Sequence, residues 1–210
     1  EKEQLRPVPD PHFERDRILM NAIRLAIPDV VLFEPRVFGD DRGFFYESFN
    51  ADKLAEHGLH MQWKQGNVSS SVKGVLRGLH YQWPKPQGKL VSVLQGEVWD
   101  VAVDIRRGSP TFGKWTAVVL SAENKRLFWI PEGFAHGFVA LSESAVFTYL
   151  CTETYDAQAD ANIAWNDPQL AIDWPIASPR RWCPPAAHRD GSRIPRPAAP
   201  WAAAPLPARP

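Results

Sequence analysis

Short β-rich segments, separated by Gly, Pro and Asn, recur along residues 20–175 and limit the possible fold more than any other feature. Each is shorter than the roughly 10 residues that a globular helix usually needs. Many short strands joined by tight turns favour a closed or sandwiched antiparallel barrel, because closure hides the strand edges. We therefore predict an all-β fold with strands at Val30–Phe33, Gly43–Phe49, Met61–Gln65, Gly74–Tyr81, Lys89–Leu94, Glu97–Ile105, Trp115–Leu120, Leu127–Ile130, Phe134–Leu141 and Ala145–Thr152.

The clearest alternation lies in Glu97–Ile105. Successive side chains of a strand point to opposite faces. The preceding Gln95-Gly96 predicts a hairpin turn, since glycine adopts a positive φ without steric cost. The strand would place Trp99, Val101, Val103 and Ile105 on one face and Val98, Asp100, Ala102 and Asp104 on the other.

One short helix is expected at Ala51–His57, which is long enough for about two turns. Asn50 can cap its first turn through its side chain. Gly58 can take the left-handed conformation that ends a helix.

The two ends of the chain differ from this body. Residues 1–19 are charged and contain no apolar run of the signal-peptide kind, so we predict an extension without function, with Met20 at a natural start. The last 36 residues hold 10 of the 20 prolines and a net charge of +5. We predict a domain at 20–175 and an extended or disordered tail at 176–210. A shifted reading frame in a GC-rich gene would give the same composition, which resequencing would test.

The whole chain carries 24 basic and 24 acidic side chains. Zero net charge gives no electrostatic reason to expect nucleic acid or an anionic membrane as a partner. No run approaches the roughly 18 apolar residues of a membrane span.

Cys151 and Cys183 have no partner at metal-like spacing, so we expect a reduced protein in the cytoplasm.

Two histidines lie in predicted strands beside charged residues: His80 follows Arg77 and precedes Lys89, and His136 ends the run PEGFAH. A lone strand histidine is commonly structural, but these charged neighbours indicate a polar cavity. Histidine titrates near neutrality and can remove a carbon-bound proton. A tyrosine such as Tyr149 can supply a proton from the opposite face. The cations could stabilise an enolate or bind phosphate.

The run PEGFAH at 131–136 resembles the second sequence motif of the cupins, which are small jelly-roll barrels. The cupin metal site also needs an earlier H-x-H pair and a Glu, where this chain has His80-Tyr81-Gln82. One imidazole and one amide are a poor set of ligands for a transition metal. We therefore expect a cupin-type jelly-roll barrel with a few short helices and no metal. A metal-dependent cupin oxygenase is the least favoured alternative.

One cupin family resembles residues 27–175 more closely, about 70% of the chain. It is the family of dTDP-4-dehydrorhamnose 3,5-epimerases, which use no metal. The matching runs are IPDV (27–30), FGDDRGFFYESF (38–49), VLRGLHYQ (75–82), QGKLV (87–91), GEVWDVAVDIRRGSPTFGKW (96–115), LSAENKR (120–126), WIPEGFAHGF (129–138) and WNDP (165–168).

The resemblance implies a cofactor-free homodimer that inverts carbons 3 and 5 of dTDP-4-dehydro-6-deoxy-D-glucose, for dTDP-rhamnose and surface polysaccharide. It assigns His80 as the general base, Tyr149 as the acid and Lys89 as the group that stabilises the enolate. The implied binding residues, some acting across the dimer, are Arg42, Glu47, Gln65, Asn67, Arg77, His136, Tyr155 and Asp160. Without the resemblance, Arg42 and Glu47 also fit a cross-strand ion pair and Tyr155 fits a surface aromatic.

The chain departs from the family pattern in two places. Gly66 replaces the Asp of a Gln-Asp-Asn run, and Ala186 stands where the family has an Asp that orients the catalytic imidazole. Asp190 lies four residues beyond that position and is a candidate substitute. Two alternatives therefore stay open beside the double epimerase. One is a single-carbon epimerase or ketoisomerase on a related nucleotide sugar, and the other is a catalytically impaired binding homologue.

Overall fold

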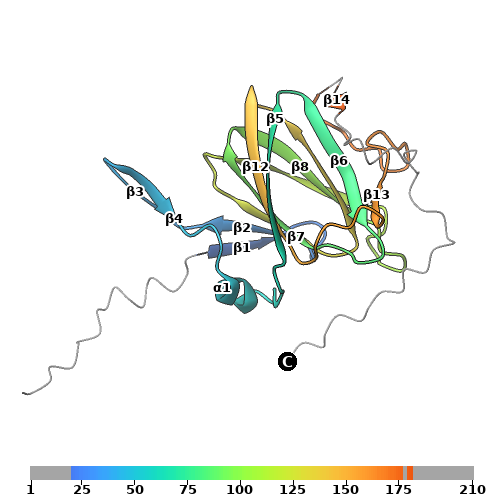
Figure 1. Cartoon of the computed structure of the whole chain (residues 1–210), viewed down its shortest axis with the longest axis horizontal. Helices are drawn as coiled ribbons and strands as arrows, with labels where there is room; N and C mark the ends of the chain where they lie inside the picture. Colours follow the sequence, from blue (N-terminus) through green and yellow to red (C-terminus); the bar gives the residue numbers. More distant parts are fainter. Residues whose placement is uncertain (1–19, 177–178, 182–210) are drawn as a thin grey trace, which may run out of the picture.

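The computed structural model describes residues 20–176 and 179–181, in which two β-sheets pack face to face (Figure 1). The prediction of an all-β fold is confirmed. Every strand pair is antiparallel except the pairing of β14 with β6. The first sheet has the order β1 (Met20–Arg24), β2 (Val31–Pro35), β10 (Leu127–Ile130), β7 (Lys89–Gln95), β12 (Ser144–Cys151) and β5 (Gln65–Val72). The second has the order β13 (Asp160–Asn162), β6 (Val75–Gln82), β11 (Phe134–Ala140), β8 (Glu97–Asp104) and β9 (Trp115–Ser121), with β14 (Arg180–Arg181) also beside β6.

Three apolar layers hold the sandwich together. The central layer fills the space between the sheets, and the outer layers cover the far face of each sheet. Strand β8 shows the predicted alternation: Val98 and Ala102 enter the central layer, whereas Val101 and Val103 enter the layer that Trp174 helps to close. Removing this much apolar surface from water is the main stabilising contribution to the fold.

The turn at Gly96 was predicted as a hairpin, and this prediction is wrong. Its flanking strands β7 and β8 belong to different sheets, so the turn carries the chain across the sandwich. Gly96 has φ +74°, and a Cβ there would lie 2.0 Å from the carbonyl oxygen of Ser144. Only glycine fits a backbone that turns this tightly against its neighbour.

The predicted strand at Met61–Gln65 is also wrong, since the strand begins at Gln65 and runs to Val72 as β5. Apolar alternation did not reveal β5 because several of its inward side chains are polar. Gln65, Asn67 and Ser69 line a cavity rather than the apolar core. A strand beside a binding cavity therefore lacks the alternation expected of a half-buried strand.

The expected helix is present as α1 (Ala51–Glu56). The Asn50 side chain accepts a hydrogen bond from the Lys53 backbone N–H at 3.1 Å, and Gly58 has φ +86° just past the end. No helix in the described part of the chain is long and apolar enough to cross a membrane.

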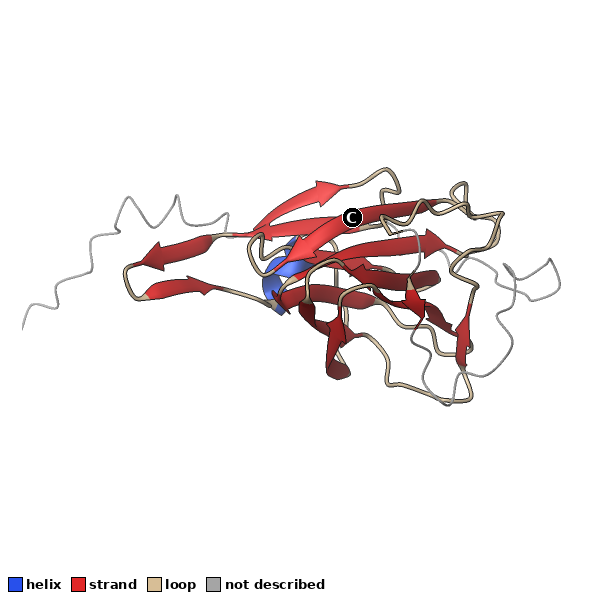
Figure 2. Cartoon of the chain, turned by 90° about the horizontal axis from the view of Figure 1, so that it is seen from above, coloured by secondary structure: helices blue, strands red, loops and turns tan. Residues whose placement is uncertain are grey.

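A hairpin made of β3 (Val37–Asp40) and β4 (Gly43–Tyr46) projects away from the sandwich (Figures 1 and 2). It pairs with neither large sheet and forms a two-stranded sheet of its own. Phe44 and Phe45 are 63% and 70% exposed. Apolar rings on a projecting ribbon mark a surface suited to contact with another protein.

Candidate active site

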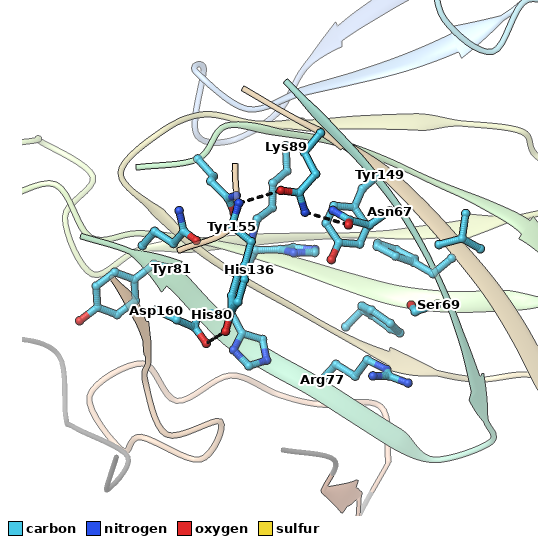
Figure 3. A pocket seen from close by; sticks show the side chains of 16 residues that line it. Asn67, Ser69, Arg77, His80, Tyr81, Lys89, His136, Tyr149, Tyr155 and Asp160 are labelled. Carbon is cyan, nitrogen blue, oxygen red and sulfur yellow. Dashed lines mark hydrogen bonds between the residues drawn. The ribbon is translucent and has the colours of Figure 1, made fainter. Parts of the chain in front are cut away.

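A cavity of about 500 Å³ opens between the two sheets (Figure 3). Nine of the eleven residues predicted for the site line it, and they come from both sheets and from the segment after β12. The complete lining is Gln65, Asn67, Val68, Ser69, Arg77, His80, Tyr81, Gln82, Gln87, Lys89, His136, Phe138, Phe147, Tyr149, Tyr155 and Asp160.

A bulge in β6 brings Arg77 and His80 into the same cavity. Residues three apart on a regular strand point to opposite faces. The register between β6 and β11 shifts between these two positions, which turns both side chains inward. Gly78, at φ +133°, permits the close approach of the strands, since a Cβ there would lie 2.4 Å from the Cα of Gly137.

His80 lies in a partly buried and positively charged setting. Burial, followed by the charges of Lys89, His136 and Arg77, lowers the pKa of His80 to about 3. The imidazole is therefore neutral at neutral pH and has a free lone pair. A neutral imidazole inside a cavity is able to accept a proton from a bound ligand.

His136 lies opposite His80 in the ladder between β11 and β6. Its Nε2 lies 2.9 and 3.0 Å from the two carboxylate oxygens of Asp100, which is completely buried on β8. Burial raises the pKa of the Asp100 carboxyl, and His136 opposes that rise. The paired carboxylate holds the imidazole of His136 in a fixed orientation at the cavity.

Tyr149 and Lys89 reach the cavity from the first sheet, on the neighbouring strands β12 and β7. Burial raises the pKa of the Tyr149 hydroxyl, which therefore keeps its proton at neutral pH. Burial also lowers the pKa of Lys89. His80 on the second sheet and Tyr149 on the first thus line one space from opposite walls.

Arg77 is held across the sandwich by β5. Its Nε donates to the Oγ of Ser71 and its Nη2 to the carbonyl oxygen of Ser70, both at 2.9 Å. Two hydrogen bonds from one guanidinium fix the orientation of the Arg77 side chain at the cavity. It is the cation expected to meet a phosphate or a developing negative charge.

Polar side chains from β5 and the segment after β12 surround another part of the cavity (Figure 3). Gln65 donates to Asn67 at 2.9 Å and accepts from the backbone N–H of Tyr155 at 2.7 Å. The Tyr155 hydroxyl donates to Asp160 at 3.3 Å, and burial raises the pKa of that carboxyl. Tyr155 is 51% exposed, which leaves its ring available to a ligand.

The structure does not bring Arg42 and Glu47 to the cavity. Arg42 lies at the tip of the β3–β4 hairpin and pairs with Asp40. Glu47 follows β4 and accepts hydrogen bonds from Asn50 and Lys53, which lower its pKa. The two residues do not form the cross-strand ion pair considered from the sequence.

Two further lining residues and two residues that contact the lining were not assigned from the sequence. Asp100 was placed on a strand face but received no role, although a buried carboxylate next to a predicted site could have indicated one. Ser71 gave no signal, because its link to Arg77 joins strands that only the fold brings together. Phe138 and Phe147 were indistinguishable from core residues.

Asp190 and Ala186 lie outside the described residues. Within residues 20–176 and 179–181, no hydrogen bond to the His80 imidazole is found. No group of three or more His, Cys, Asp or Glu side chains in the same part of the chain is arranged to hold a metal ion.

Comparison with known proteins identifies the family. The profile of the dTDP-4-dehydrorhamnose 3,5-epimerases matches residues 24–193. A dTDP-4-dehydrorhamnose 3,5-epimerase of Pseudomonas aeruginosa is 61% identical over 158 residues, which cover 75% of this chain and 87% of that protein. The chain belongs to the dTDP-4-dehydrorhamnose 3,5-epimerase family. The resemblance seen in its sequence is thereby confirmed.

Solved structures of this epimerase family have the same fold. The Legionella pneumophila enzyme, in complex with dTDP-4-keto-L-rhamnose, is 56% identical with a TM-score of 0.76, covering 78% of this chain and 88% of that chain. A more distant relative is a 3'-monoepimerase of Streptomyces bikiniensis in complex with dTDP-quinovose. It is 30% identical with a TM-score of 0.73, covering 81% of this chain and 86% of that chain.

Proposed function

We propose that this chain is a dTDP-4-dehydrorhamnose 3,5-epimerase, which converts dTDP-4-dehydro-6-deoxy-D-glucose to dTDP-4-dehydro-L-rhamnose. The observation that carries the proposal is the placement of His80 and Tyr149 on opposite walls of one cavity. Lys89 lines the same cavity from β7, the strand next to that of Tyr149. Inversion of a carbon needs a base on one face of the sugar and an acid on the other. A single base that returned its own proton would restore the starting configuration.

His80 acts as the base. The protons on carbons 3 and 5 are acidic because both carbons are α to the ketone at carbon 4, so their removal gives an enolate. The low pKa of His80 keeps the imidazole unprotonated and ready to accept the proton. Negative charge then develops on the ketone oxygen, where the ammonium of Lys89 stabilises it inside the cavity.

Tyr149 supplies the proton that completes inversion at carbon 5, and solvent water on the same side supplies the proton at carbon 3, while His80 releases each proton it takes to solvent. Burial raises the pKa of the Tyr149 hydroxyl, so the acid form is present at neutral pH. Arg77, Gln65 and Asn67 bind polar parts of the substrate, and His136 is oriented for the same purpose by Asp100. Tyr155 stacks on the thymine, with Asp160 beside it. No cofactor or metal takes part.

Two copies of the chain form the working unit, with the β3–β4 hairpin of one copy completing the cavity of the other. The hairpin projects from its own sandwich and exposes aromatic side chains, which supports an exchanged position. Arg42 and Glu47 would then reach the nucleotide of the partner's cavity. The homodimer works in the cytoplasm and supplies rhamnose for surface polysaccharide.

A coupled assay tests the activity. The full chain is given dTDP-4-dehydro-6-deoxy-D-glucose, NADPH and a reductase specific for the epimerised ketone, and loss of NADPH is followed. We expect turnover that depends on the chain. Absence of turnover while dTDP still binds would contradict the proposal.

A second candidate function is that of a slow, binding-competent homologue. It is favoured by the missing partner of His80 among the described residues, since an unoriented imidazole is a weaker base. In the serine-protease template, loss of the orienting carboxylate costs about 10⁴ in rate. An Asp190→Asn variant of the full chain decides the point. A large loss of turnover in this variant assigns the orienting role to Asp190. Unchanged turnover shows that His80 works without Asp190.

A further inference from the structure

The segment 153–156, which carries Tyr155, has no regular secondary structure. Its first three residues form no backbone–backbone hydrogen bond within the described part of the chain. Lys64 and Lys85 make partly exposed ion pairs with the two carboxylates of the segment, at 2.6 and 2.9 Å. Exposed ion pairs contribute little to stability. The position of this segment must therefore depend on other contacts.

Three glutamine side chains hold the backbone of the segment. Gln65 on β5 accepts a hydrogen bond from the Tyr155 N–H at 2.7 Å. Gln87, which precedes β7, donates to the carbonyl oxygen of Glu153 at 2.8 Å. The third is Gln82, the last residue of β6. The segment is thus fixed from both sheets, through side chains that contact its main chain.

Gln82 makes most of these contacts. Its Oε1 accepts from the Asp156 N–H at 2.8 Å, and its Nε2 donates to the carbonyl oxygens of Thr154 and Lys85 at 3.2 and 3.0 Å. A reversed amide would place its oxygen against two carbonyl oxygens, so only one orientation fits. Gln82 lines the cavity but is 4% exposed, and both hydrogens of its amide are already donated to the backbone.

We infer that Gln82 is a positioning residue that fixes the Tyr155 ring at the nucleotide part of the cavity. The inference rests on the proposed function, in which Tyr155 stacks on the thymine. Gln82 bonds to the residue before Tyr155 and to the residue after it. Asp160, which accepts from the Tyr155 hydroxyl, lies opposite Gln82 in the ladder between β13 and β6. Both ends of the tyrosine are therefore held at the end of β6.

A ring that is fixed before the base arrives loses less freedom on binding. Stacking of a base on an aromatic side chain contributes about fivefold to a hundredfold to affinity. Release of the backbone around Tyr155 should remove part of this contribution. The proton-transfer residues His80 and Tyr149 make no contact with the segment through Gln82, so the effect should fall on binding rather than on the chemical step.

Gln82→Met in the full chain tests the inference, because it keeps the length of the side chain and removes its hydrogen bonds. Calorimetry should show about tenfold weaker binding of dTDP. In the coupled assay KM should rise by a similar factor, while kcat stays within about threefold of wild type.

Ser142→Ala is the matched control. The Ser142 hydroxyl also ties two backbone groups together, accepting from the Glu97 N–H at 2.8 Å and donating to the carbonyl oxygen of Ser144 at 2.7 Å. It lies before the start of β12, whereas Tyr155 follows the end of that strand. Its loss should lower the melting temperature and leave the affinity for dTDP unchanged.

A double-mutant cycle shows whether Gln82 acts through Tyr155. Tyr155→Ala alone should weaken dTDP binding by about fivefold to a hundredfold. Adding Gln82→Met should then cost less than about twofold, because the ring to be positioned is gone. Losses that multiply would overturn the inference. Wild-type affinity in Gln82→Met would also overturn it and leave the proposed function intact, whereas a wild type that does not bind dTDP would overturn both.

Hydrogen exchange on the wild type keeps the inference testable if Gln82→Met does not fold. The Asp156 amide, bonded to the Gln82 side chain, should exchange at least about a hundredfold more slowly than an unstructured amide. Exchange at the unprotected rate would contradict the inference, because the backbone beside Tyr155 would then not be held.

Discussion

The cavity and the β3–β4 hairpin both carry residues predicted to bind substrate, but they are built in opposite ways. The cavity is assembled within one chain: its walls come from two packed sheets, and its polar groups contact one another. The hairpin touches neither large sheet through strand pairing and exposes its aromatic rings. A single chain therefore assembles the cavity, whereas the nucleotide site, as we propose, also takes residues from the hairpin of the partner chain.

Among changes to the cavity, loss of the proposed base should have the largest effect on turnover. His80→Ala removes the proposed base, so turnover should fall by about 10³ to 10⁴. The coupled assay measures this loss. Binding of dTDP should be kept, and His60→Ala, at an exposed position just after α1, serves as the control. Turnover within tenfold of wild type would remove His80 from the mechanism.

The next largest effect is expected on the free energy of unfolding, when the bulge that turns Arg77 and His80 inward is disturbed. In Gly78→Ala the new methyl would lie 2.4 Å from the Cα of Gly137, a backbone atom that cannot swing aside. Urea unfolding should show a loss of about 3 kcal/mol or more. Gly74→Ala is the matched control: it also has a positive φ, but nothing lies within 4 Å. Its cost should be about 1 to 2 kcal/mol. Equal losses in both variants would show that the close approach is unimportant.

The neutral state of His80 predicts a dependence of stability on pH. Its pKa in the folded chain is about 3, below the 6.5 expected when unfolded. As the pH falls below about 6.5, His80 becomes protonated in the unfolded chain but not in the folded chain. The free energy of unfolding therefore decreases with acidification. Between pH 7.5 and 5, wild type should lose about 1 to 2 kcal/mol more than His80→Gln in urea unfolding. Parallel curves for the two proteins would contradict the buried neutral imidazole.

The smallest single effect is expected on the hairpin. Arg42→Ala leaves every cavity side chain in place and should raise KM about tenfold through loss of one phosphate contact. Mixing tests where the arginine acts. In a dimer of Arg42→Ala and His80→Ala chains, one cavity has both intact groups only if the hairpin is exchanged. Assayed well below KM, where Arg42→Ala alone keeps about a tenth of the wild-type rate, a random mixture should then reach about a quarter of the wild-type activity. About a twentieth of the wild-type activity, in dimers shown to have mixed, would mean that each hairpin serves its own cavity.

Sequence reasoning succeeded where side chains report directly on their surroundings. The apolar alternation of Glu97–Ile105 located β8, and the motif around His80 located residues that line the cavity. It failed at β5, whose inward side chains are polar because they face the cavity, and at Gly96, whose turn joins two sheets. Which glycine makes a hairpin and which crosses a sandwich depends on long-range pairing.

The site shows the same division between local and long-range information. The resemblance supplied nine residues that do line the cavity, yet the contacts that hold them required the fold. Asp100 is 36 residues from His136, and Arg77 reaches across the sandwich to Ser71. The bulge at Gly78 reverses the alternation that a sequence pattern assumes. Such orienting contacts are set by register, which short motifs do not specify.

The central claim is that the cavity moves protons at both carbons next to the ketone, and isotope incorporation tests it most directly. The full chain is incubated with dTDP-4-dehydro-6-deoxy-D-glucose in deuterium oxide, all ketones present are reduced with sodium borohydride, and the products are examined by mass spectrometry with fragmentation. We predict deuterium at carbon 3 and at carbon 5. Deuterium at one carbon alone would make the chain a single-carbon epimerase, and deuterium at neither would contradict proton abstraction by His80.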